Sequence, residues 1–390
     1  MLRDITLKNF RTFDHFAFDG FTHVNLIVGK NNSGKTGLLE AVYLLLNQGS
    51  PYYLVESLRL RGEGVSTDFL SDDDQRRFRT RRSFSIAHLF YGHTPLAFAR
   101  DWNQSNMFDD VDYASRVRAT AIAISSKEDR AQTLSIRLAE KPPNHTDMSE
   151  RLNPSERVEA TYDLVISYSG TSVDDHVAAR EYTVPVFADL SIYDGYARGP
   201  GRVAPHLLIP TDRTSNSRLA EYWNAITLTP REDKVVQALQ ILEPSVDRIS
   251  FTSQLTAPPD ILIKLKGQSV PLPLGTMGDG MRRILALVAA AVVAEGGSLC
   301  IDEIDTGLYY RAQVDMWRLL LDLSKRIGVQ IFATTHSLDC VQAFEIALAL
   351  GGDDSRGKLL RLERYKGGIR AVDYSAEELS IASRESIEVR

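Results

Sequence analysis

The residues best suited to chemistry form one short stretch, Gly29-Lys30-Asn31-Asn32-Ser33-Gly34-Lys35-Thr36, with the spacing G-x-x-x-x-G-K-T. Glycines in this pattern let the backbone wrap around phosphate oxygens, and the helix that follows directs its N–H groups at the anion. Lys35 would bind the β- and γ-phosphates, and Thr36 would offer its hydroxyl to Mg²⁺. The pattern predicts a site for a nucleoside triphosphate. Its predicted contacts are Gly29, Asn31, Asn32, Ser33, Gly34, Lys35, Thr36 and Gly37.

The elements around this stretch come in the order that phosphate binding requires. Residues 24–28 are a short β-branched run suited to a buried parallel strand. Residues 37–46 have the apolar periodicity of a helix, which is expected to end near Gly49 and Pro51. Strand, glycine loop and helix are therefore expected in this order, after one or two further short strands nearer the N-terminus.

Two later strands end in residues that could act on a bound phosphate. Residues 298–301 are apolar and are followed by Asp302 and Glu303. In P-loop ATPases the aspartate of such a pair holds Mg²⁺ through water, and the glutamate activates the attacking water. A second apolar run, residues 329–336, ends in His336, which could touch the γ-phosphate and sense hydrolysis. A lone histidine after a strand is usually structural, but its position downstream of Asp302 favours the functional role.

A glycine-rich turn at residues 274–283 opens a predicted helix at residues 284–295. Such a turn is a second anion-binding site without a lysine, centred on Gly278, Asp279 and Gly280. A single chain gains nothing from two such sites for one triphosphate. Two chains do, because each could present this turn to the γ-phosphate held by the P-loop of the other. We therefore expect a homodimer with composite sites.

Taken in order, these motifs resemble the ABC-type ATPase heads of the SMC/RecF group, and most closely the OLD-like ATPases of bacteria and archaea. The likeness rests on the P-loop and on four further segments. These are Asn9-Phe10-Arg11-Thr12-Phe13, Met277-Gly278-Asp279-Gly280-Met281-Arg282-Arg283, Ile301-Asp302-Glu303-Ile304-Asp305-Thr306-Gly307-Leu308 and Thr334-Thr335-His336-Ser337. The motifs cover residues 1–50 and 270–345, and the middle of the chain matches only in general layout.

The resemblance implies an α/β fold: a P-loop NTPase of the ABC-ATPase head type, with a mixed β-sheet, helices, an inserted antiparallel β region and a helical segment. It also implies ATP and Mg²⁺ as cofactors and head-to-head dimerisation driven by ATP. Glu303 would be the general base, His336 the switch and Lys35 the charge clamp. Thr36 and Asp302 would hold Mg²⁺, and Arg11 would lie near the nucleotide. The preference for adenine is implied by the resemblance alone.

Three positions depart from the pattern of that group. Gly278 stands where ABC proteins usually have serine, so a hydroxyl contact to the γ-phosphate is lost or moves to Thr276. Tyr309 follows Gly307-Leu308 where the group commonly has histidine, which puts the dimer-loop contact in doubt. The glutamine loop has no firm position, and Gln75 is a candidate only because it follows the first helix.

The chain of 390 residues is expected to form several lobes. We expect an N-terminal ATPase lobe with the P-loop at residues 1–90 and an inserted, mainly antiparallel β region at 91–204. A helical segment follows at 205–265, and a C-terminal ATPase lobe at 266–390 carries the signature turn, the Asp-Glu pair and His336. The tail contains a Ser-x-x-Glu capping box at Ser375 and Glu378.

Composition favours a cytoplasmic protein. The chain is 43% hydrophobic, has two cysteines without disulfide or metal spacing, and shows no secretory leader or membrane span. A net charge of −6 argues against coating of nucleic acid by the whole surface. The absence of heptads excludes tethering by long coiled coils, and the short tail after His336 leaves no room for the nuclease domain of full OLD proteins. We therefore expect an ATPase without its own nuclease.

Three functions remain open from the sequence. The first is an ATPase that regulates a separately encoded effector, in phage defence or DNA maintenance. The second is a RecF-like ATPase that clamps DNA, supported by five arginines within residues 76–82, although such a run more often pairs with acidic neighbours such as those at 72–74. The third is a scaffold that binds ATP and barely hydrolyses it, against which the intact Glu303 argues.

Overall fold

The computed structural model of the chain is described in terms of the residues whose placement is defined. These are residues 1–69, 79–84, 86–93, 121–127, 131–140, 162–171, 177–185, 204–211, 214–240, 243–254, 257–351, 356–385 and 389. Gln75, Arg76, Arg77 and the acidic residues at 72–74 lie outside these ranges. The expectations that concern them therefore stay predictions.

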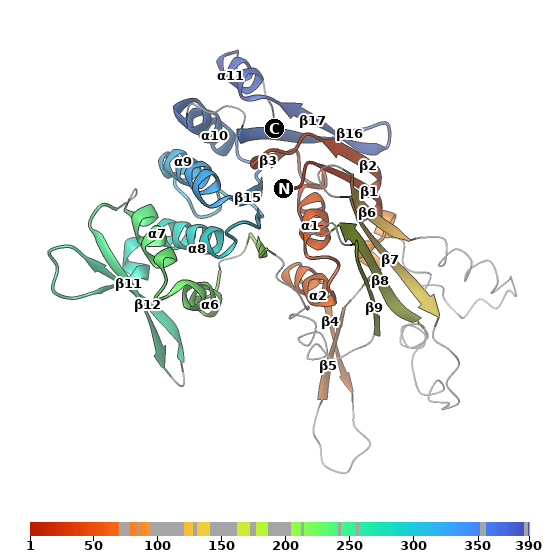
Figure 1. The fold of residues 1–390 in the computed structure, drawn as a ribbon, viewed down its shortest axis with the longest axis horizontal. Coiled ribbons are helices and arrows are strands. Elements are labelled where there is room, and N and C mark those ends of the chain that lie inside the picture. The colour runs from red at the N-terminus through yellow and green to blue at the C-terminus, as the bar shows by residue number, and fades with distance from the viewer. Residues whose placement is uncertain are drawn as a thin grey trace, which may run out of the picture.

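A six-stranded sheet forms the centre of the molecule and carries the P-loop strand in its interior (Figure 1). Five of its strands are parallel, and the last is antiparallel to its neighbour. The order across the sheet is β10 (His206–Ile209), β14 (Ser298–Ile301), β15 (Gln330–Thr334), β3 (Val24–Val28), β16 (Gly357–Tyr365) and β17 (Gly368–Tyr374). β3, β14 and β15 are buried along their whole length, as expected for parallel strands covered on both faces.

A second six-stranded sheet is entirely antiparallel. Its order is β2 (Phe13–Asp19), β1 (Asp4–Phe10), β6 (Ile122–Ser126), β7 (Gln132–Glu140), β8 (Tyr162–Thr171) and β9 (Val177–Pro185). The antiparallel strands expected in the middle of the chain thus extend a hairpin formed by its first residues, with Thr6 opposite Ser125. The division at residue 90 stays a prediction, and strands from both sides of it belong to this one sheet.

The P-loop helix α1 (Lys35–Leu46) packs between the two sheets, which explains why nearly all of it is buried. Alternate residues of β3 point to opposite sides of the central sheet: Leu26 belongs to one hydrophobic core and Ile27 to the other. The core around Ile27 also contains α1 and the antiparallel sheet. After α1 follow α2 (Pro51–Leu60), the hairpin of β4 (Gly64–Phe69) and β5 (Arg79–Phe84), and the short 3-10 turns η1 (Ile86–Leu89) and η2 (Tyr91–His93).

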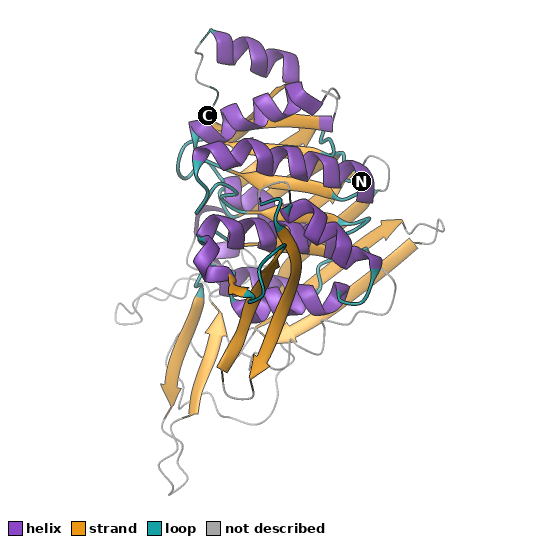
Figure 2. Cartoon of the chain, turned by 90° about the vertical axis from the view of Figure 1, so that its left-hand side faces the viewer, coloured by secondary structure: helices purple, strands orange, loops and turns teal. Residues whose placement is uncertain are grey.

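Helices cover the other face of the central sheet, and Figure 2 looks onto this layer. They are α6 (Asn216–Ile226), α7 (Pro230–Leu239), α8 (Asp279–Val293), α9 (Tyr310–Ile327) and α10 (Leu338–Gly351). A small sheet of β11 (Val246–Gln254), β12 (Ala257–Leu265) and β13 (Leu272–Pro273) packs beside α6 and α7, and the turn η4 (Leu274–Met277) leads into α8. α11 (Ala376–Arg384) closes the chain.

The expected α/β fold with a mixed sheet is confirmed, and three local expectations need correction. Residues 205–265, expected as a helical segment, contain two helices and also β10, β11 and β12. The helix after the glycine turn begins at Asp279 rather than Ile284, because Gly278, with φ 88°, already makes the turn. β15 ends at Thr334, so His336 lies in the following loop. The capping box is confirmed: Ser375 N–H donates to Glu378, and Glu378 N–H to Ser375 Oγ at 3.2 Å.

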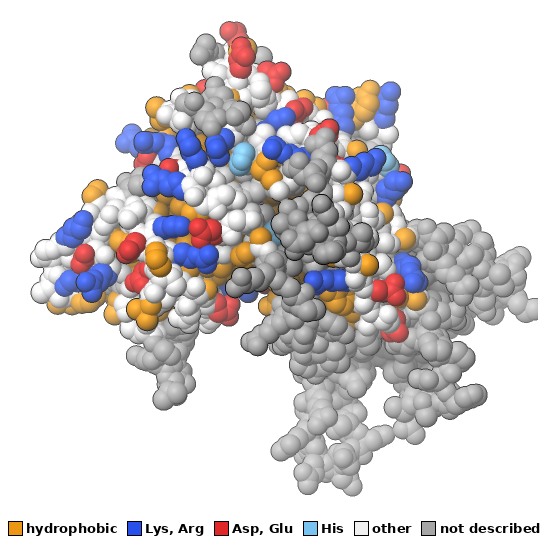
Figure 3. Space-filling model, in the orientation of Figure 1, with side chains coloured by type: hydrophobic (Ala, Val, Ile, Leu, Met, Phe, Trp, Pro, Cys, Tyr) orange, Lys and Arg blue, Asp and Glu red, His pale blue; other side chains and the backbone are white. Residues whose placement is uncertain are grey.

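The surface of the described residues mixes the two signs of charge. Lys and Arg side chains are scattered over the face drawn in Figure 3, with Asp and Glu between them. Within the same described ranges, no helix is long and apolar enough to span a bilayer.

Stability should fall in mild acid because of His206, at the start of β10. Burial, together with the positive N-terminal amino group, lowers the pKa of His206 from 6.5 to about 4, and its Nδ1 lies 2.8 Å from Ser298 Oγ. Between these pH values the unfolded chain binds a proton that the folded chain does not. The free energy of unfolding should therefore decrease by roughly 2–3 kcal/mol from this group as the pH falls from 6.5 to 4. Urea denaturation at several pH values checks this, and His206→Gln should flatten that part of the profile. Parallel profiles for the two proteins would contradict it.

Candidate functional site

The P-loop folds around its own lysine. Lys35 Nζ donates to the carbonyl oxygens of Gly29 at 2.6 Å and Lys30 at 3.1 Å, which places the ammonium group at the centre of the loop. Burial lowers the pKa of Lys35, and the negative charges of Asp302 and Glu303 oppose this shift. The lysine is thus held in a partly desolvated position where an anionic ligand would complement its charge.

Two glycines of the loop are required by close packing as well as by their backbone angles. Gly29 and Gly34 have φ values of 149° and 94°. A Cβ at Gly29 would lie 2.5 Å from the carbonyl oxygen of Leu362 in β16, and one at Gly34 would lie 2.8 Å from the Phe13 ring. Only glycine therefore fits at either place. These contacts fix the loop between β16 and the start of β2.

The carboxylate of Asp302 accepts hydrogen bonds from three threonine hydroxyls. Thr36 Oγ1 lies 3.1 and 3.2 Å from the two carboxylate oxygens, Thr334 Oγ1 lies at 2.6 Å and Thr211 Oγ1 at 3.2 Å. The structure thus brings together the two residues that the sequence assigns to Mg²⁺, Thr36 and Asp302. Hydroxyl and carboxylate oxygens are ligands that suit this hard cation. No group of three or more His, Cys, Asp or Glu side chains that could hold a metal occurs among the described residues.

Glu303 occupies an unusual backbone conformation directly after this aspartate. Its φ is 44°, in the left-handed region, which costs a residue other than glycine on the order of 1–3 kcal/mol. Its N–H donates to Thr334 Oγ1 at 2.9 Å, which helps to hold the turn. Glu303 Oε1 lies 3.5 Å from His336 Nδ1, and the two side chains are 35% and 56% exposed. The predicted base and the predicted switch are therefore neighbours at a solvent-accessible place.

Arg283, in the first turns of α8, also stabilises the turn at Asp302 and Glu303. Its buried guanidinium donates to the carbonyl oxygens of Pro210 at 3.3 Å, Asp302 at 3.2 Å and Glu303 at 3.1 Å. Burial lowers the pKa of Arg283, against the nearby carboxylates, which raise it. No separate role for Arg283 could be predicted from the sequence, because only the tertiary structure places α8 against this turn.

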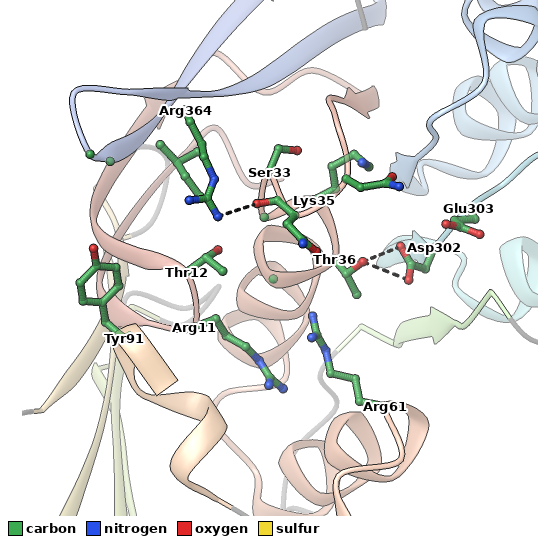
Figure 4. A pocket seen from close by; sticks show the side chains of 18 residues that line it. Arg11, Thr12, Ser33, Lys35, Thr36, Arg61, Tyr91, Asp302, Glu303 and Arg364 are labelled. Carbon is green, nitrogen blue, oxygen red and sulfur yellow. Dashed lines mark hydrogen bonds between the residues drawn. The ribbon is translucent and has the colours of Figure 1, made fainter. Parts of the chain in front are cut away.

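A cavity of about 850 Å³ opens over the P-loop (Figure 4). The loop and α1 form its floor, and Asp302 and Glu303 stand at one end. Four other parts of the chain complete its walls, through Arg11 and Thr12, Arg61, Tyr91 and Gly92, and Arg364 with Gly367, Gly368 and Ile369. The last group, from the β16–β17 hairpin, was not expected from the sequence, because only the pairing of β16 with β3 brings it there.

Arg11 lines this cavity, but its guanidinium is engaged in an ion-pair network. Nε lies 2.9 Å from Glu40 and Nη1 lies 2.6 Å from Glu63, while Arg61 pairs with the same Glu40. Arg11 and Glu40 are both 2% exposed, and burial raises the pKa of Glu40. The network ties the turn after β1 to α1 and to the residues after α2. Contact of Arg11 with a nucleotide stays a prediction.

The signature residues lie apart from this cavity. Gly278, Asp279 and Gly280 are at the start of α8 and are not among its lining residues. The hydroxyl of Thr276, considered as a replacement for the missing serine, donates to the carbonyl oxygen of Pro273 at 2.7 Å. A phosphate contact by any of these residues would therefore involve a ligand outside this cavity, and it stays a prediction.

Comparison with known proteins decides the family. A model described as "AAA ATPase domain" matches residues 1–175 and 211–341. The chain belongs to this family. An "ATP/GTP phosphatase" of Helicobacter pylori is 24% identical over 369 residues, or 88% of each chain. The DNA replication and repair protein RecF of Bacillus mycoides is 43% identical over 44 residues, and the DNA double-strand break repair Rad50 ATPase of Nanoarchaeum equitans is 27% identical over 86 residues. These two matches cover 11% and 22% of this chain, and 12% and 11% of those proteins.

The likeness of the AAA ATPase chain to solved structures is weaker. An SMC head bound to the C-terminal winged-helix domain of ScpA aligns over 97% of this chain and 99% of that one, with a TM-score of 0.46 and 12% identity. An SMC head domain from Thermotoga maritima gives a TM-score of 0.41 at 13% identity, over 96% and 99% of the two chains. The family and the sequence relatives confirm the expected SMC/RecF-like P-loop ATPase, whereas the closer likeness to OLD-like proteins stays a prediction.

The turn at Asp302 and Glu303 should depend on Arg283 for its stability. Arg283→Leu keeps much of the side-chain volume but leaves three carbonyl oxygens without their donor. We expect the free energy of unfolding to fall by about 2–4 kcal/mol, because unsatisfied buried groups each cost on the order of 1–3 kcal/mol. Urea denaturation measures the loss. Arg283→Lys, which keeps the charge and some of the donors, should lose less, and equal stability of the leucine variant and the original protein would refute the assignment.

Proposed function

We propose that the chain binds ATP with Mg²⁺ in the cavity over the P-loop and hydrolyses it. The observation that carries this proposal is the contact between Thr36 and Asp302, with Glu303 next in the chain. It joins the phosphate-binding loop to the acidic pair that the chemistry needs. The family and the relative named "ATP/GTP phosphatase", at 24% identity, support the same reaction.

Each residue of the site would have its own role in hydrolysis. Lys35 would neutralise charge on the β- and γ-phosphates, and the loop N–H groups would bind their oxygens. Mg²⁺, held by Thr36 and through water by Asp302, would supply further charge neutralisation at the phosphates. Glu303 would accept a proton from the attacking water. His336, 3.5 Å from the Glu303 carboxylate, would orient that carboxylate and respond to the γ-phosphate.

We further propose that two chains associate head to head when ATP is bound. The signature turn of each chain would then meet the γ-phosphate held by the other. Support comes from the position of Gly278, Asp279 and Gly280 at a helix start outside the chain's own cavity. The side chains of Tyr309 and Tyr310 are 64% and 46% exposed. They follow Gly307 and Leu308, which lie beside Gly280, and they would contact the partner.

The ATPase is proposed to regulate a separately encoded effector in the cytoplasm, in phage defence or DNA maintenance. This part rests on the likeness of its motifs to OLD-like ATPases. Copurification from the native host would test it, because an effector should be recovered with the ATPase. Activity of the ATPase alone, with no protein recovered, would count against it.

Glu303→Gln should separate binding from turnover. Loss of the general base should lower the rate of phosphate release by roughly 10²–10⁴-fold, with nucleotide affinity little changed. The trapped variant should then form a stable dimer with ATP and Mg²⁺, measured as mass by light scattering. Glu377→Gln, an exposed change on α11, is the matched control and should keep both the monomer mass and the rate of the original protein.

Gly280→Asp tests the composite site within the same experiment. A Cβ at Gly280 would meet nothing closer than 3.8 Å, so the chain itself should tolerate the change. A negative charge there should repel the γ-phosphate held by the partner and abolish dimerisation and turnover. A mass that never changes with ATP, and turnover unaffected by Gly280→Asp, would refute the head-to-head proposal and leave the P-loop assignment standing.

A DNA-clamping ATPase is the second candidate, favoured by the local similarity to RecF and Rad50, whose names include DNA repair. The arginines at 76–82 would supply the phosphate contacts. In that case duplex binding should weaken steeply with salt, and replacing Arg77, Arg79 and Arg81 by glutamate should abolish it. Fluorescence anisotropy with labelled duplex checks this; binding that ignores both salt and these changes would exclude the clamp. An ATP-gated scaffold is the third candidate, which measurable turnover would exclude.

A further inference from the structure

The cavity is longer than the phosphate site within it. Asp302 and Glu303 mark the end where the γ-phosphate would lie, and Lys35 and Thr36 follow along the floor (Figure 4). At the other end stand Thr12 and Tyr91, with Arg364 on the wall above them. A nucleoside attached to phosphates on the P-loop would therefore extend into the end bounded by these residues.

The wall above that end is the β16–β17 hairpin, and the sheet pairing explains its position. β16 runs parallel to β3, with Leu360 opposite Ile27 and Arg361 opposite Val28. The chain that leaves β3 becomes the P-loop, so the chain that leaves β16 must turn beside it. Two contacts fix this arrangement: Arg364 Nη2 donates to the carbonyl oxygen of Asn32 at 3.4 Å, and Ile369 packs beside Gly34.

Arg364 differs from the other arginines of the hairpin in its partners. Arg361 and Arg370 both pair with Glu363, and Arg370 also stacks on the Tyr365 ring at 4.1 Å. Arg364 forms no ion pair with any residue that the structure describes, and its hydrogen bond to Asn32 uses one of five donors. Its side chain is exposed and lines the cavity. A planar cation is therefore available at the nucleoside end.

We propose that Arg364 contacts the base of the bound nucleotide by stacking its guanidinium plane on the purine ring, opposite Thr12 and Tyr91. The proposal rests on the proposed binding of ATP. Backbone at Gly367 and Gly368 completes this wall without side chains. A guanidinium stacked on a ring contacts its π-face, which adenine and guanine share, rather than the edges that distinguish them. This contact therefore strengthens purine nucleotide binding without selecting between ATP and GTP.

The test compares nucleotides with inorganic tripolyphosphate, which carries the same phosphates and no nucleoside. Dissociation constants for ATP, GTP and tripolyphosphate, each with Mg²⁺, are measured by calorimetry on the full chain. Arg364→Gln should weaken both nucleotides about tenfold, as expected for loss of a partly desolvated cation–π contact. It should leave tripolyphosphate unchanged. Lys366→Gln removes the same charge from the same hairpin at a residue that does not line the cavity, and should change none of the three.

Two further variants distinguish a loss of stacking from a loss of charge and from a loss of stability. Arg364→Lys keeps the charge but not the plane, so it should weaken ATP nearly as much as Arg364→Gln. Gly368→Ala adds a methyl group that meets only the Tyr365 carbonyl oxygen at 3.8 Å, so the hairpin should tolerate it while the nucleoside end narrows. It should weaken ATP but not tripolyphosphate, with an unchanged melting temperature.

The outcomes distinguish this inference from the proposed function. Equal weakening of ATP and tripolyphosphate by Arg364→Gln would make Arg364 a phosphate contact and overturn the stacking. Unchanged ATP binding in Arg364→Gln would overturn any contact. If the original protein binds none of the three ligands, or if Lys35→Ala does not weaken them, the P-loop site itself fails, and the proposed function fails with it.

Discussion

The site depends on the carboxylate of Asp302, which accepts hydrogen bonds from threonine hydroxyls on three different parts of the chain. Thr36 lies in the first turn of the P-loop helix, Thr334 ends β15 and Thr211 follows β10, and all three donate to Asp302. Hydrogen bonds to a charged group contribute about 1.5–3 kcal/mol each. They also hold the end of β14 against the start of α1, although more than 260 residues separate Thr36 from Asp302 in the chain. The two halves of the nucleotide site therefore have one fixed geometry.

Rigidity around this carboxylate comes from the position of α1 between the two sheets. The helix cannot slide without disturbing the hydrophobic core that it shares with Ile27 of the central sheet and with the antiparallel sheet. The loop before the helix has equally little freedom: its glycines lie against the Leu362 carbonyl oxygen and the Phe13 ring. A phosphate site built on such elements is preorganised, so a ligand loses little binding energy to ordering it.

The features that could be predicted from the sequence are those that local residue patterns encode. The strands at 24–28, 298–301 and 330–334 are mainly apolar runs, and the P-loop spacing identifies its own lysine and threonine. β11 was missed because most of its residues are polar and only Val246, Ile249 and Phe251 are apolar. The largely apolar residues 261–265 do indicate a strand, and they lie within its partner β12. The position of Arg364 in the cavity wall could not be predicted in this way, because it follows from the register of β16 against β3. No local pattern encodes that register.

Arg283 gives the signature turn a direct physical connection to Glu303. Asp279 and Arg283 lie one helical turn apart on α8, so a displacement of the helix start moves the guanidinium as well. That guanidinium donates to the carbonyl oxygens of Asp302 and Glu303, and Glu303 is held in the left-handed region against its own preference. A strained residue needs continuous support from its surroundings. A ligand at the start of α8 would therefore be connected to the backbone of Glu303 through the Arg283 side chain.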